Sequence, residues 1–448
     1  MGRLFGTDGV RGVANRDLTP ELAMKIGRAT ACVLTDSGNQ PRILIGCDTR
    51  ASGDMLQAAL TAGLCSVGAD VVLLGVVPTP AVAYLVGKLH ADAGVMISAS
   101  HNPCEFNGIK IFSGEGYKLP DALEEEIENL VFDEENLPEA PISGGVGQVK
   151  ERYDAIDLYV DHIEQSAPNR LDGLRIAIDC ANGSASRTAE RVFTDLGAEC
   201  HMLACEPNGV NINDECGSTH MENLMDFVVK NKLDAGIAFD GDADRCLAVD
   251  ENGQMVDGDF MMAICALDMK SRGVLRHDTV VGTVMTNMGF VRFCRDNGLN
   301  FVATKVGDRY VLEEMLLKGY TFGGEQSGHY IFREFATTGD GQLSAVQFLS
   351  ILSRRHARLS SLITVMERYP QVLINVRVSN EGKRRFYTDA DVRAAVQRAE
   401  ALLGEDGRLL VRPSGTEPLL RVMTEGRDHG LITRVANDVA DVIRDRLA

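Results

Sequence analysis

Residues 42–68 read RILIGCDTRASGDMLQAALTAGLCSVG, a short apolar run followed by a turn and an amphipathic stretch. The run Arg42–Cys47 has the length and apolar character of a strand that is buried on both faces. A helix is predicted from about Asp54 to Val67, because Gly68 stands just past its last turn, where glycine commonly ends a helix. The stretch therefore predicts a β-α unit of an α/β fold.

The same design recurs twice along the chain. Strand Arg175–Asp179 precedes a helix that runs to about Leu196, and strand Thr279–Met285 precedes a helix from about Met288 to Asp296. More strands are predicted at 71–76, 94–97, 235–239 and 301–304. A helix is predicted at Thr79–Lys88, with Thr79 as its N-cap and proline at the first helical position. Repetition of the unit predicts several similar α/β layers.

The last part of the chain has a different order. From Pro370 onward the pattern predicts strand, helix, two strands and a final helix, which is typical of a small α+β domain. We therefore predict an α/β protein with three similar mixed α/β sheet domains and a smaller α+β C-terminal domain. The predicted boundaries are 1–148, 149–253, 254–369 and 370–448.

Charge and cysteine usage exclude several classes of function. Lys and Arg number 45 against 64 Asp and Glu, a net charge of −19 in 448 residues, which disfavours nucleic acid and anionic membranes as partners. The 11 cysteines are scattered singly with no C-x-x-C pair, which favours a reducing, cytoplasmic location. No apolar run approaches the ~18 residues of a membrane span.

The segment Asp240–Arg245, DGDADR, follows the predicted strand at 235–239. Three carboxylates at alternate positions repel one another unless a cation lies between them, and Mg²⁺ prefers oxygen ligands. An EF-hand loop is the alternative, with Glu251 at its twelfth position, but Arg245 stands at the sixth, which requires glycine. A solvated acidic turn is the other alternative. The position at the carboxyl end of a strand favours a metal site.

The segment 98–103, SASHNP, follows the predicted strand at 94–97. It places serines beside His101 on a turn that Asn-Pro favours, so a serine nucleophile is one interpretation and a polar turn the other. The residues alone do not choose between Ser98 and Ser100. The chain has no G-x-S-x-G elbow around them, which argues against an α/β-hydrolase.

Three further segments carry polar groups suited to a phosphorylated sugar. Residues 323–329, GGEQSGH, offer a carboxylate, an amide, a hydroxyl and an imidazole for sugar hydroxyls. Residues 412–418, RPSGTEP, with Arg421, offer backbone N–H groups and guanidinium groups for a phosphate. Cations stand beside or near glycine at 7–12, 107–110 and 305–309. Each segment taken alone is also compatible with an ordinary surface turn.

Together these segments resemble the phosphohexomutase superfamily. The resemblance rests on TDGVRG at 7–12, SASHNP at 98–103, DGDADR at 240–245, GEQSGH at 324–329 and RPSGTEP at 412–418, and it covers essentially the whole chain. It implies four domains around a central cleft. The Gln of GEQSGH, the opening segment and the length are most similar to members that act on glucosamine phosphates, with glucose or mannose phosphates as the alternative.

The resemblance also implies roles for individual residues. Ser100 would carry a phosphoryl group and, with Asp240, Asp242 and Asp244, hold one Mg²⁺. The other implied catalytic residues are Arg11, His101, Lys110 and His329. The implied substrate-binding residues are Arg245, Lys305, Arg309, Glu325, Ser327, Arg412, Ser414, Gly415, Thr416 and Arg421. Cys104-Glu105-Phe106 departs from the run usual in relatives, which leaves the detailed shape of the serine loop open.

The implied reaction interconverts glucosamine 6-phosphate and glucosamine 1-phosphate through a 1,6-bisphosphate, which also serves as activator, and supplies cell-wall precursor synthesis. Lys110 and His329 are the candidate acid and base, in either order. A small phosphosugar is the expected partner of a monomer or homodimer. Two other classes stay open: a metal-dependent sugar phosphatase, which would release free phosphate, and a non-catalytic binding protein, which has no use for three metal-spaced aspartates.

Overall fold

The computed structural model describes residues 4–6, 8–34, 40–133, 137, 139–414 and 418–448. Its strands form four sheets, of six, five, four and three strands. The chain divides into two compact units: residues 1–285 with 298–365, and residues 286–297 with 366–448. The first unit contains three α/β layers and the second a smaller α+β layer, as the sequence predicts.

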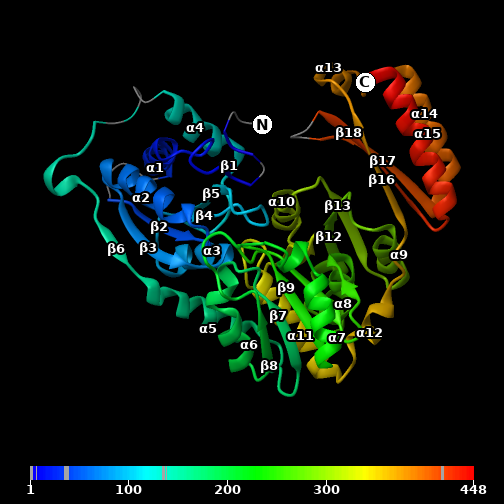
Figure 1. Ribbon diagram of the computed structural model, residues 1–448, viewed down its shortest axis with the longest axis horizontal. Coiled ribbons are helices and arrows are strands. Elements are labelled where there is room, and N and C mark those ends of the chain that lie inside the picture. Colours follow the sequence, from blue (N-terminus) through cyan, green and yellow to red (C-terminus); the bar gives the residue numbers. More distant parts are fainter. Residues whose placement is uncertain (1–3, 7, 35–39, 134–136, 138, 415–417) are drawn as a thin grey trace. The chain divides into compact units, whose positions relative to one another are not determined.

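The first sheet has the order β1-β5-β4-β2-β3-β6 (Figure 1). Strand β2 pairs in parallel with β3 and β4, whereas β5 pairs antiparallel with β4 and β1. The strands are β1 (Val10–Val13), β2 (Arg42–Cys47), β3 (Asp70–Val76), β4 (Ala93–Ile97), β5 (Phe106–Ser113) and β6 (Val149–Glu151). The helices of this layer are α1 (Pro20–Leu34), α2 (Ser52–Ser66), α3 (Thr79–Lys88) and α4 (Asp121–Phe132).

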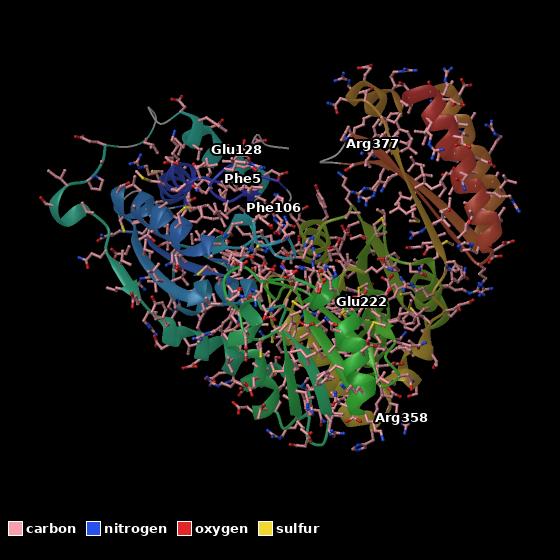
Figure 2. The ribbon with its side chains drawn as sticks, in the orientation of Figure 1. Phe5, Phe106, Glu128, Glu222, Arg358 and Arg377 are labelled. Carbon is pink, nitrogen blue, oxygen red and sulfur yellow. The ribbon has the colours of Figure 1, made fainter. Side chains whose placement is uncertain are left out.

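Helices α1 and α2 pack closely because glycines stand where they cross. A Cβ atom on Gly63 would lie 2.1 Å from the carbonyl oxygen of Met24, and one on Gly27 would lie 2.6 Å from that of Leu60. The core between these helices and the sheet is aliphatic. The N-terminal segment is tied to α4, since the N–H of Phe5 donates to Glu128 Oε1 at 2.7 Å; both residues are labelled in Figure 2.

The second and third layers repeat the parallel strand–helix design. The second sheet has the order β11-β10-β9-β7-β8, with β7 (Arg175–Asp179), β8 (Glu199–Leu203), β9 (Ala235–Phe239), β10 (Cys246–Asp250) and β11 (Met255–Val256). The third has the order β13-β12-β14-β15, with β12 (Thr279–Thr283), β13 (Asn300–Thr304), β14 (Phe322–Gly324) and β15 (Tyr330–Phe332). Their helices are α5 (Ile156–Ser166), α6 (Ala189–Asp195), α7 (Glu222–Asn231), α8 (Gly258–Ser271), α10 (Asp308–Lys318), α11 (Gly341–Arg355) and α12 (Leu359–Leu362).

The second unit has a three-stranded antiparallel sheet in the order β16-β18-β17. Its elements are α9 (Met288–Asp296), β16 (Gln371–Arg377), α13 (Asn380–Arg385), α14 (Ala390–Leu403), β17 (Gly407–Pro413), β18 (Leu419–Gly426) and α15 (His429–Leu447). Helices α14 and α15 pack together against the sheet through an aliphatic core (Figure 1). Strand β18 pairs with both β16 and β17, so it is the central strand of this sheet.

Several local expectations differ from the structure. Thr79 is the first residue of α3 and Pro78 the N-cap, so the predicted N-cap is wrong by one residue. The predicted strand at 279–285 ends at Thr283, and the helix after β7 begins only at Ala189, after a 3₁₀ turn. Helix α9 groups with the second unit, where the N–H of Met288 donates to Glu425. Strand β6 pairs with β3 of the first sheet. The domain boundaries themselves stay predictions.

Candidate active site

The serine segment leaves β4 at its carboxyl end and turns back at Ser100. Ser100 has a φ of 54°, a left-handed backbone that residues other than glycine rarely adopt, and it is buried. Its Oγ donates to Asp240 Oδ2 at 2.5 Å and lies 3.4 Å from His101 Nδ1. Ser98 Oγ instead accepts from the N–H of Ser100 at 2.9 Å. The structure thus brings Ser100, rather than Ser98, to the aspartate cluster.

A buried ion pair supports this loop from behind. Ser98 Oγ donates to Asp48 Oδ2 at 2.6 Å, and Arg50 Nε donates to the same oxygen at 2.9 Å. Burial raises the pKa of the Asp48 carboxyl, although the Arg50 guanidinium and the Ser98 hydroxyl oppose the shift. Asp48 and Arg50 directly follow β2, which lies beside β4, so the same sheet edge supplies both the serine loop and its support.

The other N–H donors of the Arg50 guanidinium bind carbonyl groups of the serine loop. Its Nη2 donates to Ser100 O at 2.9 Å and Asn102 O at 2.8 Å, and its Nη1 donates to Phe106 O at 3.0 Å and to Pro103 O. Asn213 Nδ2 also donates to Ser100 O, at 2.9 Å. These bonds hold the left-handed turn, whose strain of about 1–2 kcal/mol would otherwise favour relaxation of the loop.

The three aspartates form the second part of the site. Ligand oxygens of Asp240, Asp242 and Asp244 lie within 4.8 Å of one another, and all three residues are buried. The chain curls as the sequence requires, because Ala243 has a φ of 56° and its N–H donates to the carbonyl of Asp240 at 3.0 Å. Gly241 is needed here, since a Cβ on it would lie 2.6 Å from the carbonyl oxygen of Ser100.

This cluster is suited to a divalent cation. Burial, followed by the charges of Asp244 and Asp242, raises the pKa of Asp240 to about 8. Within the part of the chain that the structure describes, Asp242 Oδ1 and Asp244 Oδ1 are buried without a hydrogen-bond partner. Unpaired buried carboxylate oxygens are costly, and a cation with oxygen ligands removes that cost. These residues fit Mg²⁺, together with an oxygen on Ser100.

Two groups from the first layer contact the cluster from the other side. Lys110, on β5, lies with Nζ 2.7 Å from Asp242 and 3.5 Å from Asp244, and these charges outweigh burial and hold its pKa above the ordinary value. Thr79 donates from Oγ1 to Asp242 Oδ2 at 2.5 Å and from its backbone N–H to Asp242 O at 2.9 Å. Helix α3 therefore presents its positive end to a carboxylate of the cluster.

Guanidinium groups with spare donors lie beside the cluster. Arg11 pairs with Asp8, and Arg245 lies 4.0 Å from Asp244, yet the Nε atoms of both arginines are buried without a hydrogen-bond partner among the described residues. Burial and then the charges of Arg245 and Arg11 lower the pKa of His101 to about 4, so its ring is neutral at pH 7. Both guanidinium groups act on the His101 ring next to Ser100, and their Nε donors have no partner among the described residues, so they suit a phosphoryl group on that serine.

His329 lies on the third side of the cluster. Its Nε2 is 3.3 Å from Asp308 Oδ2 and its Nδ1 is 3.8 Å from Asp244 Oδ1. Burial alone would lower the pKa of the imidazole, but these two carboxylates outweigh it and raise the pKa to about 10. The N–H of Gly339 donates to His329 Nε2 at 3.1 Å, a bond that only an unprotonated Nε2 can accept, so Gly339 favours the neutral ring while the two carboxylates favour the cation. Lys110 and His329 are therefore the acid–base candidates beside the cluster.

The other predicted sugar-binding residues lie on the third layer. Glu325 is half-buried and its Oε1 accepts from the N–H of Gly307 at 3.1 Å, whereas Ser327 is exposed. Lys305 is exposed, with Nζ 5.6 Å from the centre of the Tyr310 ring. Arg309 lies instead among three carboxylates, those of Asp121, Glu124 and Glu313. Its predicted contact with substrate stays a prediction.

The predicted phosphate loop lies in the second unit. Arg412 on β17 and Arg421 on β18 are register partners across the antiparallel ladder, and burial together with Arg421 lowers the pKa of Arg412. Ser414 is buried and its N–H donates to the carbonyl of Leu419 at 2.9 Å. Gly415 and Thr416 lie outside the described residues. Adjacent guanidinium groups repel unless an anion lies between them, so the pair is suited to a phosphate.

Sequence reasoning missed the residues that support the site. Asp48, Arg50 and Asn213 were not singled out, although Asp48 and Arg50 follow a buried strand just as Ser98 and Asp240 do. Position at the carboxyl end of a parallel strand was thus a usable signal for the first two. Lys118 and Asp308, which contact each other at 2.6 Å, gave no comparable signal because their segments lie far apart in the sequence.

Four segments of the chain match the domains of one protein family. Residues 2–138, 157–253 and 257–369 match the alpha/beta/alpha domains I, II and III described as phosphoglucomutase/phosphomannomutase, and residues 373–442 match its C-terminal domain. The chain belongs to the phosphoglucomutase/phosphomannomutase family. The phosphohexomutase resemblance, the four-domain architecture and the isomerase class expected from the sequence are thereby confirmed.

Individual relatives in this family cover the chain fully. Proteins named phosphoglucosamine mutase from Caldanaerobacter subterraneus subsp. tengcongensis and Acetivibrio thermocellus are 52% and 53% identical to it, with 100% of both chains covered in each case. A solved phosphoglucomutase/phosphomannomutase family protein from Burkholderia thailandensis is 25% identical, covers 98% of this chain and 97% of its own, and superimposes with a TM-score of 0.83.

A more distant solved structure shares the fold alone. Aspergillus fumigatus N-acetylphosphoglucosamine mutase, in complex with GlcNAc-6P and magnesium, is 16% identical, with a TM-score of 0.69 over 99% of this chain and 96% of that chain. Among the described residues, no helix combines the length and the apolar character that crossing a membrane requires.

Proposed function

We propose that this chain is a phosphoglucosamine mutase, which interconverts glucosamine 6-phosphate and glucosamine 1-phosphate through a phosphorylated Ser100. The observation that carries the proposal is the 2.5 Å contact between Ser100 Oγ and Asp240 inside the cluster of three aspartates. The choice of amino sugar rests on the full-length relatives, which carry that name at 51–53% identity.

The reaction consists of two phosphoryl transfers. The O1 hydroxyl of glucosamine 6-phosphate attacks the phosphorus on Ser100, the P–Oγ bond breaks, and the hydroxyl proton leaves to a base. The resulting 1,6-bisphosphate turns over, and Ser100 Oγ takes the phosphoryl group from O6 while that oxygen is protonated. Such transfers have little covalent chemistry to assist, so positioning and charge neutralisation account for most of the catalysis.

The residues of the first unit supply these two effects. Asp240, Asp242, Asp244 and an oxygen on Ser100 would hold Mg²⁺, which neutralises charge on the transferring group when bound. The Nε donors of Arg11 and Arg245, which have no hydrogen-bond partner within the described part of the chain, would bind the phosphoryl oxygens. One of Lys110 and His329, in its neutral form, would accept the proton of the attacking hydroxyl, and the other, in its protonated form, would donate a proton to the oxygen that becomes a hydroxyl. His101 lies beside Ser100 Oγ as a neutral hydrogen-bond partner.

The rest of the proposed site binds the substrate. Glu325 and Ser327 would accept and donate hydrogen bonds to sugar hydroxyls, with Lys305 and Arg309 nearby in sequence. Arg412, Ser414, Gly415, Thr416 and Arg421 would bind the phosphate that does not react. A hexose 1,6-bisphosphate would serve as activator because it can phosphorylate Ser100 directly.

The proposal is tested by turnover of glucosamine, glucose and mannose 6-phosphates side by side, with Mg²⁺ and the matching 1,6-bisphosphates. The expected result is the highest kcat/KM for glucosamine 6-phosphate, with Ser100→Ala inactive and Ser327→Ala weakened mainly in KM. Peptide mapping should place the phosphate of the active protein on Ser100. Preferred turnover of glucose or mannose phosphate, or release of free phosphate as the main product, would overturn the assignment.

A further inference from the structure

Six titratable side chains, in which carboxylates alternate with basic groups, form a closed ring that includes Asp244 of the aspartate cluster, and half of them have no role in the reaction described above. In order around this ion ring they are Asp8, Lys110, Asp244, His329, Asp308 and Lys118. The shortest contacts are those of Lys118, whose Nζ lies 2.7 Å from Asp8 Oδ1 and 2.6 Å from Asp308 Oδ2.

The ion ring has a catalytic half and a supporting half. Lys110, Asp244 and His329 are the half that the proposed reaction uses. Asp8 and Asp308 each contact one of these cations, since Asp8 Oδ2 lies 3.1 Å from Lys110 Nζ and Asp308 Oδ2 lies 3.3 Å from His329 Nε2. Lys118 is the cation that joins these two carboxylates. Lys118 is therefore linked to Lys110 through Asp8 and to His329 through Asp308.

Lys118 stands on a well-anchored part of the backbone. It forms a bridge to Phe112 of β5, and the turn before it is closed by the N–H of Ser113, which donates to Tyr117 O at 2.8 Å. Asp308 is the first residue of α10, where the positive end of the helix favours a carboxylate. Asp8 belongs to the N-terminal segment that precedes β1. Lys118 thus ties together the first and third layers, which carry Lys110 and His329 respectively.

The surroundings of Lys118 leave no room for a sugar phosphate. The cavity that Lys118 lines together with Asp8, Lys110 and Arg309 measures about 10 Å³, which is the space of a single water. The Lys118 side chain is 12% exposed. Among the residues that the structure describes, this cavity admits no sugar phosphate beside Lys118, so the effect of Lys118 on the reaction passes through its two carboxylate partners.

We propose that Lys118 is a positioning residue for phosphoryl transfer, which holds Lys110 through Asp8 and His329 through Asp308. Without its ammonium group, two carboxylates that share one cation face each other and repel. Asp8 would then draw on Lys110 and Arg11, its remaining partners, and Asp308 on His329, which moves the acid–base candidates away from the aspartate cluster. The inference rests on the proposed mutase function and adds to it a residue that does not touch the substrate.

The test compares Lys118→Met with Asp308→Asn and with the double variant, using wild-type turnover of glucosamine 6-phosphate as reference. Misplacement of a catalytic group by about 1 Å can cost about 100-fold in rate. We expect Lys118→Met to lower kcat by about 10- to 100-fold while KM stays within about twofold. Lys118→Met breaks the connection through Asp308 as well as the one through Asp8, so adding Asp308→Asn should make the double variant no slower than the slower single variant.

Lys318→Met is the matched control, since Lys318 is an exposed lysine on the last turn of α10 and should keep wild-type kcat. If Lys118→Met does not fold, Asp308→Asn, which keeps the size of the side chain, carries the test with the same expected loss in kcat. A kcat within twofold of wild type, a change in KM alone, or multiplicative losses in the double variant would overturn the inference. Inactive wild-type protein would instead overturn the proposed function.

Discussion

Replacement of Arg50 by methionine tests whether the serine loop is held in place by the charges behind it. The side chain of Arg50 is wholly buried, and its guanidinium makes five hydrogen bonds, one to Asp48 and four to carbonyl oxygens between Ser100 and Phe106. Arg50→Met removes all five and leaves Asp48 as a buried charge without its cation. Breaking a buried ion pair in this way costs about 3–5 kcal/mol of folding free energy.

The catalytic effect follows from the backbone of Ser100. A left-handed conformation costs about 1–2 kcal/mol in a residue with a Cβ, and the φ of 54° at Ser100 is held by the bonds from Arg50 and Asn213. If the loop relaxes by that amount, the share of molecules with Ser100 in place falls about 5- to 30-fold. We therefore expect kcat to fall by that factor.

Two measurements separate stability from positioning. Calorimetric unfolding should show the loss in stability, and the double variant Asp48→Asn/Arg50→Met should recover much of it, because no buried charge is left unpaired. The kcat for glucosamine 6-phosphate should stay low in both variants, since the loop carbonyls lack donors in each. Arg16→Met is the control, because the exposed pair of Arg16 with Asp17 contributes little. Wild-type kcat in the double variant would refute the role assigned to Arg50.

Three further predictions concern pH, metal and phosphate. Burial raises the pKa of Asp340 from 3.8 to about 7, so the contribution of Asp340 to folding stability is complete below pH 3.8 and is lost as pH rises through about 7. Asp340→Asn can still cap α11 and should flatten this decline in stability when unfolding is followed by calorimetry at several pH values. An unchanged slope of stability against pH would contradict the prediction. Mg²⁺ at about 100 times its dissociation constant should stabilise the wild type by about 2.7 kcal/mol. The Asp242→Asn variant should be stabilised far less. Equal thermal shifts for the wild type and the variant would argue against the aspartate cluster as the metal site. Arg412→Met should raise KM for glucosamine 6-phosphate by about 10- to 100-fold without loss of thermal stability, because Arg421 loses a repelling neighbour; an unchanged KM would argue against a phosphate at this pair.

Local sequence patterns were sufficient for the elements whose signals are strong. Strands Arg42–Cys47, Arg175–Asp179 and Ala235–Phe239 and helices Thr79–Lys88 and Met288–Asp296 have the predicted bounds. Each combines a buried apolar run or an amphipathic stretch with glycine or proline near an end. The local sequence and the tertiary packing therefore favour the same helix or strand at these positions. Thr79 shows the limit of this reasoning, because its hydroxyl donates to Asp242 instead of accepting from the N–H groups of its own helix.

The sequence by itself determined the family, the three aspartates and the two candidate serines, because spacing along one strand end places such groups together whatever the rest of the chain does. Only the tertiary structure decided between Ser98 and Ser100, since both follow the same strand and just one reaches Asp240. It also decided which charges surround Lys110 and His329 and the place of Lys118. Those depend on charges brought within about 4 Å by residues up to 190 positions apart in the chain, and Coulomb interactions at that range are set by distance in space.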